Sequence, residues 1–108
     1  MALPVRAFPA YFSPISKQAL TVSSSAVGLT VPTSPTVRAV LITVEHITSA
    51  GDTIRHWKTG DNPTTGDGQL LYSGDILEIT NVSAINNARF IATGNDMKLM
   101  IEYYGGGV

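Results

Sequence analysis

The chain has 108 residues, of which 44% are hydrophobic, and its seven basic and eight acidic residues give a formal net charge of −1. This length fits a single domain with one core, and the scattered Lys and Arg argue against nucleic-acid binding, which needs clustered positive charge. The chain contains no cysteine, which excludes disulfides, thiolate metal sites and a cysteine nucleophile and fits synthesis in a reducing cytoplasm.

The charged fraction is low. Only 14% of the residues are charged, compared with about 25% in typical soluble domains. The surface is therefore neutral and rich in Thr, Ser and Asn. Such a surface is typical of a protein that packs against partners, although sandwich folds in general also lean this way.

Residues 1–17 differ from the rest of the chain. Prolines recur there at a five-residue spacing and disfavour helix, at Pro4, Pro9 and Pro14. They also interrupt the apolar run that a signal peptide would need, so we expect no export signal. The longest apolar run of the chain, residues 39–42, is too short for a membrane span.

The same segment carries three aromatic residues, Phe8, Tyr11 and Phe12. An extended arm with this apolar content is unfavourable in water. The arm either folds back over its own domain as an edge segment or docks on a neighbouring subunit or another protein. In the second case Phe8, Tyr11 and Phe12 are the expected anchors.

Period-two alternation of apolar residues begins at Gln18 and predicts about eight short strands. They cover residues 18–22, 27–31, 36–47, 53–58, 69–72, 76–80, 89–93 and 97–104. The 36–47 strand is apolar on both faces between Val37 and Val44. We therefore expect it at the centre of a sheet, or with one face covered by another subunit.

Turn chemistry separates these strands. Residues 50–52 (Ala-Gly-Asp) predict a hairpin that joins the 36–47 strand to the 53–58 strand. Gly, Asp, Asn and Pro crowd into residues 60–68 and predict a long loop. Residues 81–87 lack a convincing cap pattern, so we expect a loop there. The glycine-rich tail, residues 105–108, is expected to be flexible.

These elements predict an all-β protein, an antiparallel β-sandwich of jelly-roll type with about eight short strands and an extended N-terminal arm. The expected organisation is an arm at residues 1–17, a sandwich domain at residues 18–104 and a tail at residues 105–108. In the closing strand two sets of side chains alternate. One set is Met97, Leu99, Ile101 and Tyr103, and the set on the opposite side is Lys98, Met100, Glu102 and Tyr104.

Candidate metal ligands are few. His46 and His56 would come near one another if their strands paired, but two imidazoles without a third ligand make a weak metal site. Asp61, Asn62 and Asp67 share a glycine-rich loop, yet their spacing does not match a calcium-binding loop and turn formation explains them equally well. We therefore predict no catalytic residues, no cofactor and no metal.

Trp57 and Tyr72 are candidate partner-binding residues. With Arg55 and Lys58 nearby, they could form a platform on which a sugar ring stacks. Tryptophan is more often a core or interface residue, so both interpretations stay open.

The stretches RHWKTGDNPTTGDGQLLYSGDILEI (residues 55–79) and ARFIATGNDMKLMIEYY (residues 88–104) resemble a group of small virion proteins of tailed bacteriophages. That group combines an Arg-containing strand, a D-G-x-x-P-T-type loop, a Gly-Asp turn and a last strand ending in aromatic residues. Here the loop departs from the pattern, with Gly60-Asp61-Asn62-Pro63-Thr64 in place of the Asp-Gly order.

The resemblance implies a structural virion protein, not an enzyme, that decorates or cements a capsid. Its expected partners are the major capsid protein and other copies of itself, as a dimer or trimer, at the capsid surface after synthesis in the host cytoplasm. The arm and loop 60–68 are the expected contact regions. The alternative is a carbohydrate-binding module, or a tail or neck component, of a phage particle.

Overall fold

The computed structural model describes residues 12–33 and 36–106, which form eight β-strands and one short helix. The strands are β1 (Phe12–Val22), β2 (Val27–Gly28), β3 (Val37–His46), β4 (Thr53–Trp57), β5 (Gln69–Tyr72), β6 (Ile76–Ile79), β7 (Arg89–Ala92) and β8 (Met97–Gly106). Helix α1 (Val82–Asn87) lies between β6 and β7. The prediction of an all-β protein with about eight strands is confirmed.

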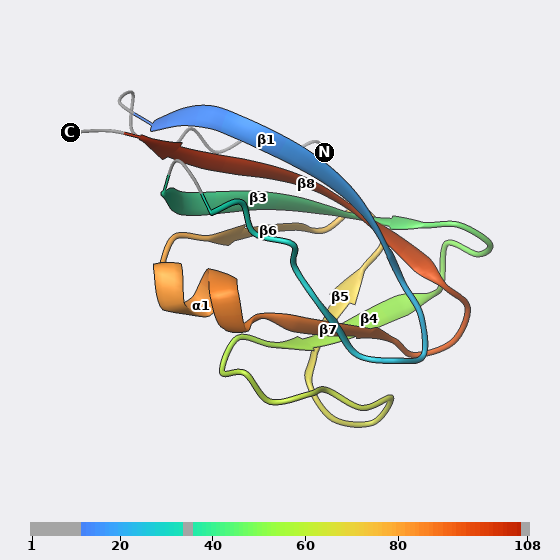
Figure 1. Ribbon diagram of the computed structural model, residues 1–108. Helices are drawn as coiled ribbons and strands as arrows, with labels where there is room; N and C mark the ends of the chain where they lie inside the picture. Colours follow the sequence, from blue (N-terminus) through green and yellow to red (C-terminus); the bar gives the residue numbers. More distant parts are fainter. Residues whose placement is uncertain (1–11, 34–35, 107–108) are drawn as a thin grey trace.

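The strands form two antiparallel four-stranded sheets that face each other (Figure 1). Sheet A has the order β1-β8-β3-β6 and sheet B the order β2-β7-β4-β5. Six of the seven consecutive connections cross between the sheets, and only the β4–β5 connection stays within one sheet. This is the strand order of a jelly roll, in which two Greek keys wrap into a sandwich. The predicted β-sandwich is confirmed.

The predicted hairpin at residues 50–52 is wrong in its pairing. The turn exists, with the Asp52 amide donating to the Ser49 carbonyl, but β3 pairs with β6 and β8 while β4 pairs with β5 and β7. The Gly-Asp turn predicts that the chain changes direction, but it does not indicate which sheet the next strand joins. In a jelly roll the next strand joins the opposite sheet.

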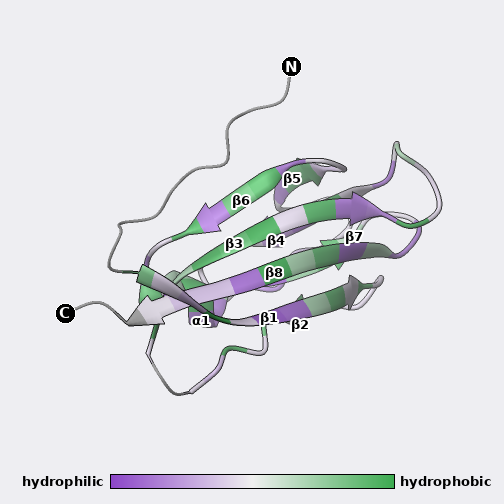
Figure 2. Ribbon diagram, turned by 90° about the horizontal axis from the view of Figure 1, so that it is seen from above, coloured by the Kyte–Doolittle hydropathy of each residue, from purple (hydrophilic) through white to green (hydrophobic). Residues whose placement is uncertain are grey.

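The core lies between the two sheets and is filled by one alternating set of side chains from each strand. In β8 this set is Met97, Leu99, Ile101 and Tyr103, all at most 3% exposed. Figure 2 looks down on sheet A, where a hydrophobic stretch of β8 lies between two hydrophilic ones. The largest other fully buried side chains are Phe90, Ile42, Ile54, Ile85, Val22, Val40 and Val44.

One buried polar group in this core belongs to Tyr103. Its hydroxyl donates a 2.6 Å hydrogen bond to Oε1 of Gln18, which also accepts from the Thr30 amide at 3.2 Å. Burial raises the pKa of Tyr103 to about 12, because the phenolate is poorly solvated there. Gln18 thereby links β1, β8 and the segment after β2.

The boundary of the N-terminal arm differs from the prediction. Strand β1 already begins at Phe12, and its residues pair with β8 from Gly106 onward, so residues 12–17 belong to sheet A. Pro14 fits this strand because β1 lies at the sheet edge, where a missing N–H is tolerated. Phe8 and Tyr11 lie outside the described residues.

The predicted tail boundary also shifts, because β8 extends to Gly106 and Gly105 is buried. A Cβ atom on Gly105 would collide with the Thr36 carbonyl oxygen and with Cδ1 of Ile15. Gly105 is thus a close-packing position at which β1, β3 and β8 meet. Its glycine is required by space, not by flexibility.

Residues 82–87 form a helix, where a loop was expected. Asn81 caps it, since its side-chain oxygen accepts a 3.0 Å hydrogen bond from the Ala84 amide. Ile85 is buried at 1% exposure and fixes the helix against the core. The cap pattern was present in the sequence, but six residues are too few for a helical period to stand out. The helix closes one end of the sandwich (Figure 1).

Candidate interaction surface

A row of Ala, Met, Thr and Ile side chains, here called the apolar row, crosses all four strands on the outward side of sheet A. Ala19 of β1 pairs with Met100 of β8, Met100 with Thr43 of β3, and Thr43 with Ile76 of β6. Ile76 is 46% exposed and Met100 is 41% exposed. We call this side the open face and define it by nine residues: Lys17, Ala19, Leu41, Thr43, Glu45, Ile76, Lys98, Met100 and Glu102.

Charged residues flank the apolar row on both sides. Two positions before Met100, Lys98 lies 4.0 Å from Glu45 of β3. Two positions after Met100, Glu102 pairs with Lys17 of β1. Glu78 of β6, next to the nine residues of the open face, faces the same side opposite Leu41 and adds a second acidic side chain to the flank of Lys17 and Glu102. The flank of Lys98 and Glu45 is therefore nearly neutral, and the other flank carries one more negative charge than positive.

The open face is hollowed beside the row. A depression of about 430 Å³ is lined by side chains of β1, β3 and β8, including Lys17, Ala19, Leu41, Thr43, Met100 and Glu102. Its walls are apolar at the centre and charged at the rim. This is the arrangement found in protein interfaces, where an apolar centre is surrounded by a polar border.

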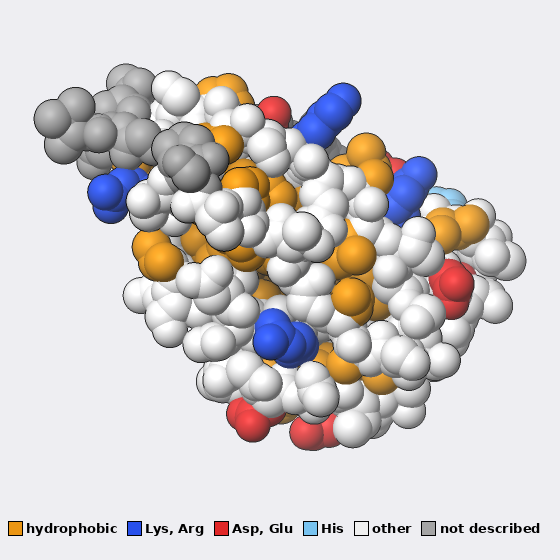
Figure 3. Space-filling model, in the orientation of Figure 1, with side chains coloured by type: hydrophobic (Ala, Val, Ile, Leu, Met, Phe, Trp, Pro, Cys, Tyr) orange, Lys and Arg blue, Asp and Glu red, His pale blue; other side chains and the backbone are white. Residues whose placement is uncertain are grey.

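The rest of the surface has few charges. Seen from the side in Figure 3, the molecule shows isolated Lys, Arg, Asp and Glu side chains among polar neutral ones, with small hydrophobic patches between them. No large field of one sign is visible on this side. Contacts by this surface would depend on shape and apolar burial more than on long-range attraction.

The predicted pair Trp57 and Tyr72 does not form one platform. Both side chains lie on the outward side of sheet B, but Tyr72 pairs with Thr53, four residues before Trp57 on β4. At about 3.3 Å per residue this places the two positions about 13 Å apart along the strands. Tyr72 is 56% exposed, whereas Trp57 is half-buried. One sugar ring cannot stack on both.

Loop 58–68 is held in place by Arg55. Its Nε donates to the Thr65 carbonyl at 3.1 Å and its Nη1 to the Gly68 carbonyl at 2.6 Å. Pro63 within the loop is buried. At Gly68 the backbone has φ of +139° and a Cβ would lie 3.0 Å from Cβ of Arg55, so this close approach requires glycine.

The acidic residues of this loop serve as turn formers. Oδ2 of Asp61 accepts a 2.6 Å hydrogen bond from the Thr59 hydroxyl, and the backbones of Thr64 and Asp67 bond to each other. Within residues 12–33 and 36–106, no three His, Cys, Asp or Glu side chains come together as metal ligands. The structure therefore does not bring Asp61 and Asp67 into a cation site.

The two histidines lie on opposite sheets. His46 at the end of β3 is exposed, and its Nδ1 lies 2.7 Å from the Ser73 hydroxyl. His56 on β4 is only 2% exposed and stacks on Phe90, with ring centroids 5.7 Å apart. They were expected to approach one another only if β3 and β4 paired, which they do not.

His56 is held neutral. Burial, together with the nearby Lys58 ammonium, lowers the pKa of His56 from 6.5 to about 4, while the hydrogen bond to Gln69 opposes the shift. Nδ1 lies 3.2 Å from the Gln69 carbonyl and therefore carries the proton. Nε2 is then the acceptor for Lys58 Nζ, 3.1 Å away. His56 joins β4 to β5 and to the start of loop 58–68.

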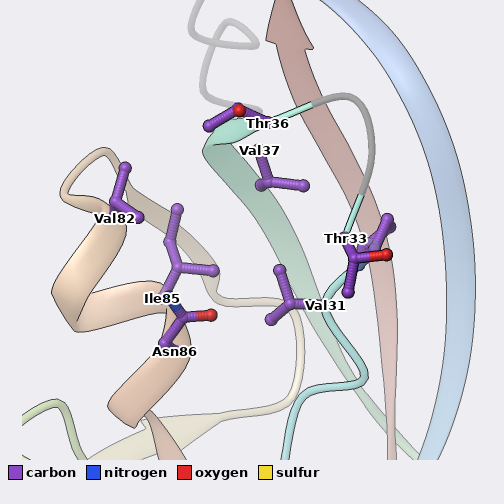
Figure 4. A pocket seen from close by; sticks show the side chains of 8 residues that line it. Val31, Thr33, Thr36, Val37, Val82, Ile85 and Asn86 are labelled. Carbon is purple, nitrogen blue, oxygen red and sulfur yellow. The ribbon is translucent and has the colours of Figure 1, made fainter.

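A second hollow lies beside α1 and was not expected from the sequence. It has a volume of about 270 Å³, and Figure 4 shows Val82 and Ile85 of α1 facing Val31 and Val37 across it. The polar side chains at its border are Thr33, Thr36 and Asn86. Ile85 and Val37 are buried parts of the core, so this hollow is an opening at the end of the sandwich.

Of the five predicted partner-binding residues, Phe12, Trp57 and Tyr72 fall within the described part of the chain. Phe12 is half-buried at the start of β1, opposite Gly106. The residues of the open face were not singled out from the sequence. The available signal was the alternation in residues 97–104, which assigned Lys98, Met100 and Glu102 to one side.

A search of protein-family models, curated proteins and solved structures finds no match to this chain. In the described residues, no helix is long and apolar enough to cross a membrane. The function of the open face is therefore inferred from the residues of this chain.

Proposed function

We propose that this protein is a structural component of a tailed-phage particle that decorates or cements the capsid by packing the open face against other proteins of the shell. The observation that carries the proposal is the apolar row, in which Met100 and Ile76 stay more than 40% exposed at the outside of a four-stranded sheet. Exposed apolar surface of this kind marks interaction sites.

Two further features support the proposal. The jelly-roll topology is shared by many capsid-forming domains, although a fold alone does not determine function. The link to phage particles comes from the resemblance in residues 55–79 and 88–104. The proposed partners are the major capsid protein and other copies of this chain, and the proposed location is the capsid surface.

The test is a measurement on particles of the virus whose genome encodes this chain. Quantitative mass spectrometry of purified virions should give a copy number comparable to that of the major capsid protein. A copy number far below that value would favour the alternative, a tail or neck component, and absence from the particle would overturn both.

Binding can be tested with capsids from which the protein has been removed. Wild-type protein should rebind, and Ile76→Asp combined with Met100→Asp should reduce the affinity by about tenfold or more, because each charge loses its water at the contact. Tyr72→Asp on sheet B is the matched control and should bind normally. Equal binding by all three proteins would contradict a role for the open face.

The arm is tested by deletion. A variant lacking residues 1–11 keeps all of β1, whereas deletion of residues 1–17 would also remove the first half of that strand. Weaker capsid binding by the shorter deletion, with an unchanged melting temperature, is the outcome expected if Phe8 and Tyr11 are anchors. Unchanged affinity would remove the arm from the proposal.

The glycan alternative is not favoured by any particular feature of the site, since Trp57 and Tyr72 are separated by about 13 Å along the strands. A glycan array with wild-type protein and Trp57→Ala tests it directly. A hit that disappears in the variant would favour carbohydrate binding over capsid decoration.

A further inference from the structure

We propose that the open face is a self-association surface, on which a second copy of this chain packs face to face about a two-fold axis that runs along the apolar row. The inference rests on the proposed function and deepens it, because it names the partner of the open face. It also predicts the geometry of the contact, which can be tested in solution without capsids.

The first argument is that the apolar row matches itself. An axis that runs across the strands, along Ala19, Met100, Thr43 and Ile76, places each of these residues over the same residue of the second copy. Two-fold interfaces are self-complementary in this way, since one patch serves both subunits. Met100 on Met100 brings together two flexible side chains of the type that fills irregular gaps.

The second argument is that the charges match when the copy is turned. Lys98 lies two residues before Met100 on β8 and Glu102 lies two residues after it. The axis turns β8 end for end, so Lys98 of each copy comes to lie over Glu102 of the other. Charged rims of opposite sign align partners and exclude wrong ones.

The other charged residues of the face do not oppose this arrangement. Lys17 lies over Thr21 of the second copy, and Glu45 lies over Leu41. Glu78, at the border of the face beside Leu41, lies over the turn before Ile76, so no charged side chain lies directly over a like charge.

An axis parallel to the strands, between β8 and β3, would instead place Met100 over Thr43 and Lys98 over Glu45 of the second copy. We choose the axis across the strands because it brings the exposed Met100 side chains of the two copies together. Only this axis opposes Lys98 to Glu102, so reversing both charges distinguishes the two arrangements.

The third argument is the depression beside the row. Its volume of about 430 Å³ lies next to Met100 and Leu41, and it is the place where side chains of a second copy would enter. Two sheets that pack face to face interdigitate their side chains over a layer about 10 Å thick.

The first experiment measures the dimer dissociation constant of the full-length chain by sedimentation velocity over a wide concentration range. Wild-type protein should show a reversible monomer–dimer equilibrium. Lys98→Glu and Glu102→Lys should each raise the dissociation constant about tenfold, because each places like charges opposite one another twice. The double variant K98E/E102K should return to within about threefold of wild type.

The rescue is informative because these two residues cannot pair within one chain. They are four residues apart on one strand, about 13 Å. Rescue by the double variant therefore reports a contact between copies. A double variant no better than the single variants would overturn the proposed axis, and a wild-type protein that stays monomeric throughout would overturn the interface.

The second experiment uses the absence of cysteine from the chain. Met100→Cys should cross-link rapidly with a short reagent that joins two thiols, because the introduced thiols face each other at the axis across a layer about 10 Å thick, which is too wide for a direct disulfide. Tyr72→Cys on the outward side of sheet B is the matched control and should cross-link slowly. Equal rates for the two variants would contradict the interface.

The results separate this inference from the proposed function. Each variant is first checked by its melting temperature, since these positions are exposed and should leave stability nearly unchanged. A monomeric protein that still rebinds capsids would overturn the self-association surface and leave capsid decoration standing. A protein that dimerises in solution but is absent from virions would support the self-association surface and overturn capsid decoration.

Discussion

The two outward sides of the sandwich differ in how far the chain covers them. On sheet B, Ile91 faces outward next to Arg55, yet it is only 7% exposed, and Arg55 ties loop 58–68 to this side. On sheet A, Met100 occupies a comparable central position and is 41% exposed. A loop of the same chain is tied to one side, where Leu70 and Tyr72 of β5 nevertheless stay exposed, and the apolar row on the other side is left open.

The comparison teaches that exposure, not residue type, separates a structural position from an interaction position. Ile91 and Met100 are similar in size and both point away from the core. Burial of the first contributes to the stability of the monomer. Burial of the second becomes available only when another protein packs on sheet A.

The strongest test of this difference is to truncate both side chains. Ile91→Ala should lower the free energy of unfolding by about 2–5 kcal/mol, because it removes a buried side chain and leaves a cavity. Met100→Ala should change it by no more than about 0.5 kcal/mol in dilute monomer. Urea unfolding of both variants measures these two changes in the free energy of unfolding. Equal losses would show that sheet A is covered as well as sheet B.

The second test uses pH. Because the folded pKa of His56 is about 4 and its ordinary value is 6.5, the unfolded chain binds the proton first. Stability should be constant above pH 6.5, fall by about 3 kcal/mol as the pH drops from 6.5 to 4, and then level off. Urea unfolding at a series of pH values measures the profile.

Two variants test whether His56 causes this pH dependence of stability. His56→Phe should flatten the decrease between pH 6.5 and 4, because the titrating group is gone. His46→Asn removes the exposed histidine and should leave the decrease intact. A wild-type decrease that persists in His56→Phe would contradict the assignment. The outcome also sharpens the comparison, since His56 lies on the core side of sheet B.

The third test concerns the end of sheet A. Gly105→Ala should lower the free energy of unfolding by about 1–3 kcal/mol, because the new methyl group collides with the Thr36 backbone and with Ile15. Gly66→Ala is the matched control, since nothing lies within 4 Å of a Cβ there. Thermal melting of both variants measures whether Gly105→Ala is less stable than Gly66→Ala. A neutral Gly105→Ala would mean that β8 ends before this residue.

The smallest effect is expected from Arg55. Arg55→Ala should reduce stability by about 1–2 kcal/mol, because two charge-assisted hydrogen bonds to the loop are lost from a partly exposed site. Arg55→Lys should not restore it, since one ammonium cannot reproduce the fork that reaches Thr65 and Gly68. Limited proteolysis should show faster cleavage in loop 58–68 for both variants. An unchanged cleavage rate would contradict the role of Arg55.

The sequence was most informative where a local pattern decides the structure. Alternation located the strand that contains Val40, Ile42 and Val44, and clustered Gly, Asp and Pro predicted a loop at residues 60–68, which in the structure begins at residue 58. Long-range pairing could not be obtained this way, because the Gly51-Asp52 turn has the same chemistry whether the next strand joins the same sheet or the opposite one. The short helix at Val82–Asn87 was missed because its Asn81 cap precedes too few residues to show a period.

The candidate surface was harder to foresee than the fold. Alternation in residues 97–104 separates Met100 from Leu99, but it does not tell which set faces solvent. Nor does it tell that Ala19, Met100, Thr43 and Ile76 form one row, since these residues come from four strands whose register depends on the assembled sheet. Trp57 and Tyr72 were singled out by residue type. Their separation along the strands depends on the register between β4 and β5, which the sequence does not give.

The position of β8 has a consequence for how the protein is made. This strand is synthesised after the other seven strands of the sandwich, yet it lies between β1 and β3 and pairs with both. Until synthesis reaches Gly106, those two earlier strands have no neighbour in common and expose unpaired backbone edges, which are prone to aggregation. The newborn chain must therefore stay unassembled until its final strand arrives, and overproduction is expected to depend on chaperones that shield the edges of β1 and β3.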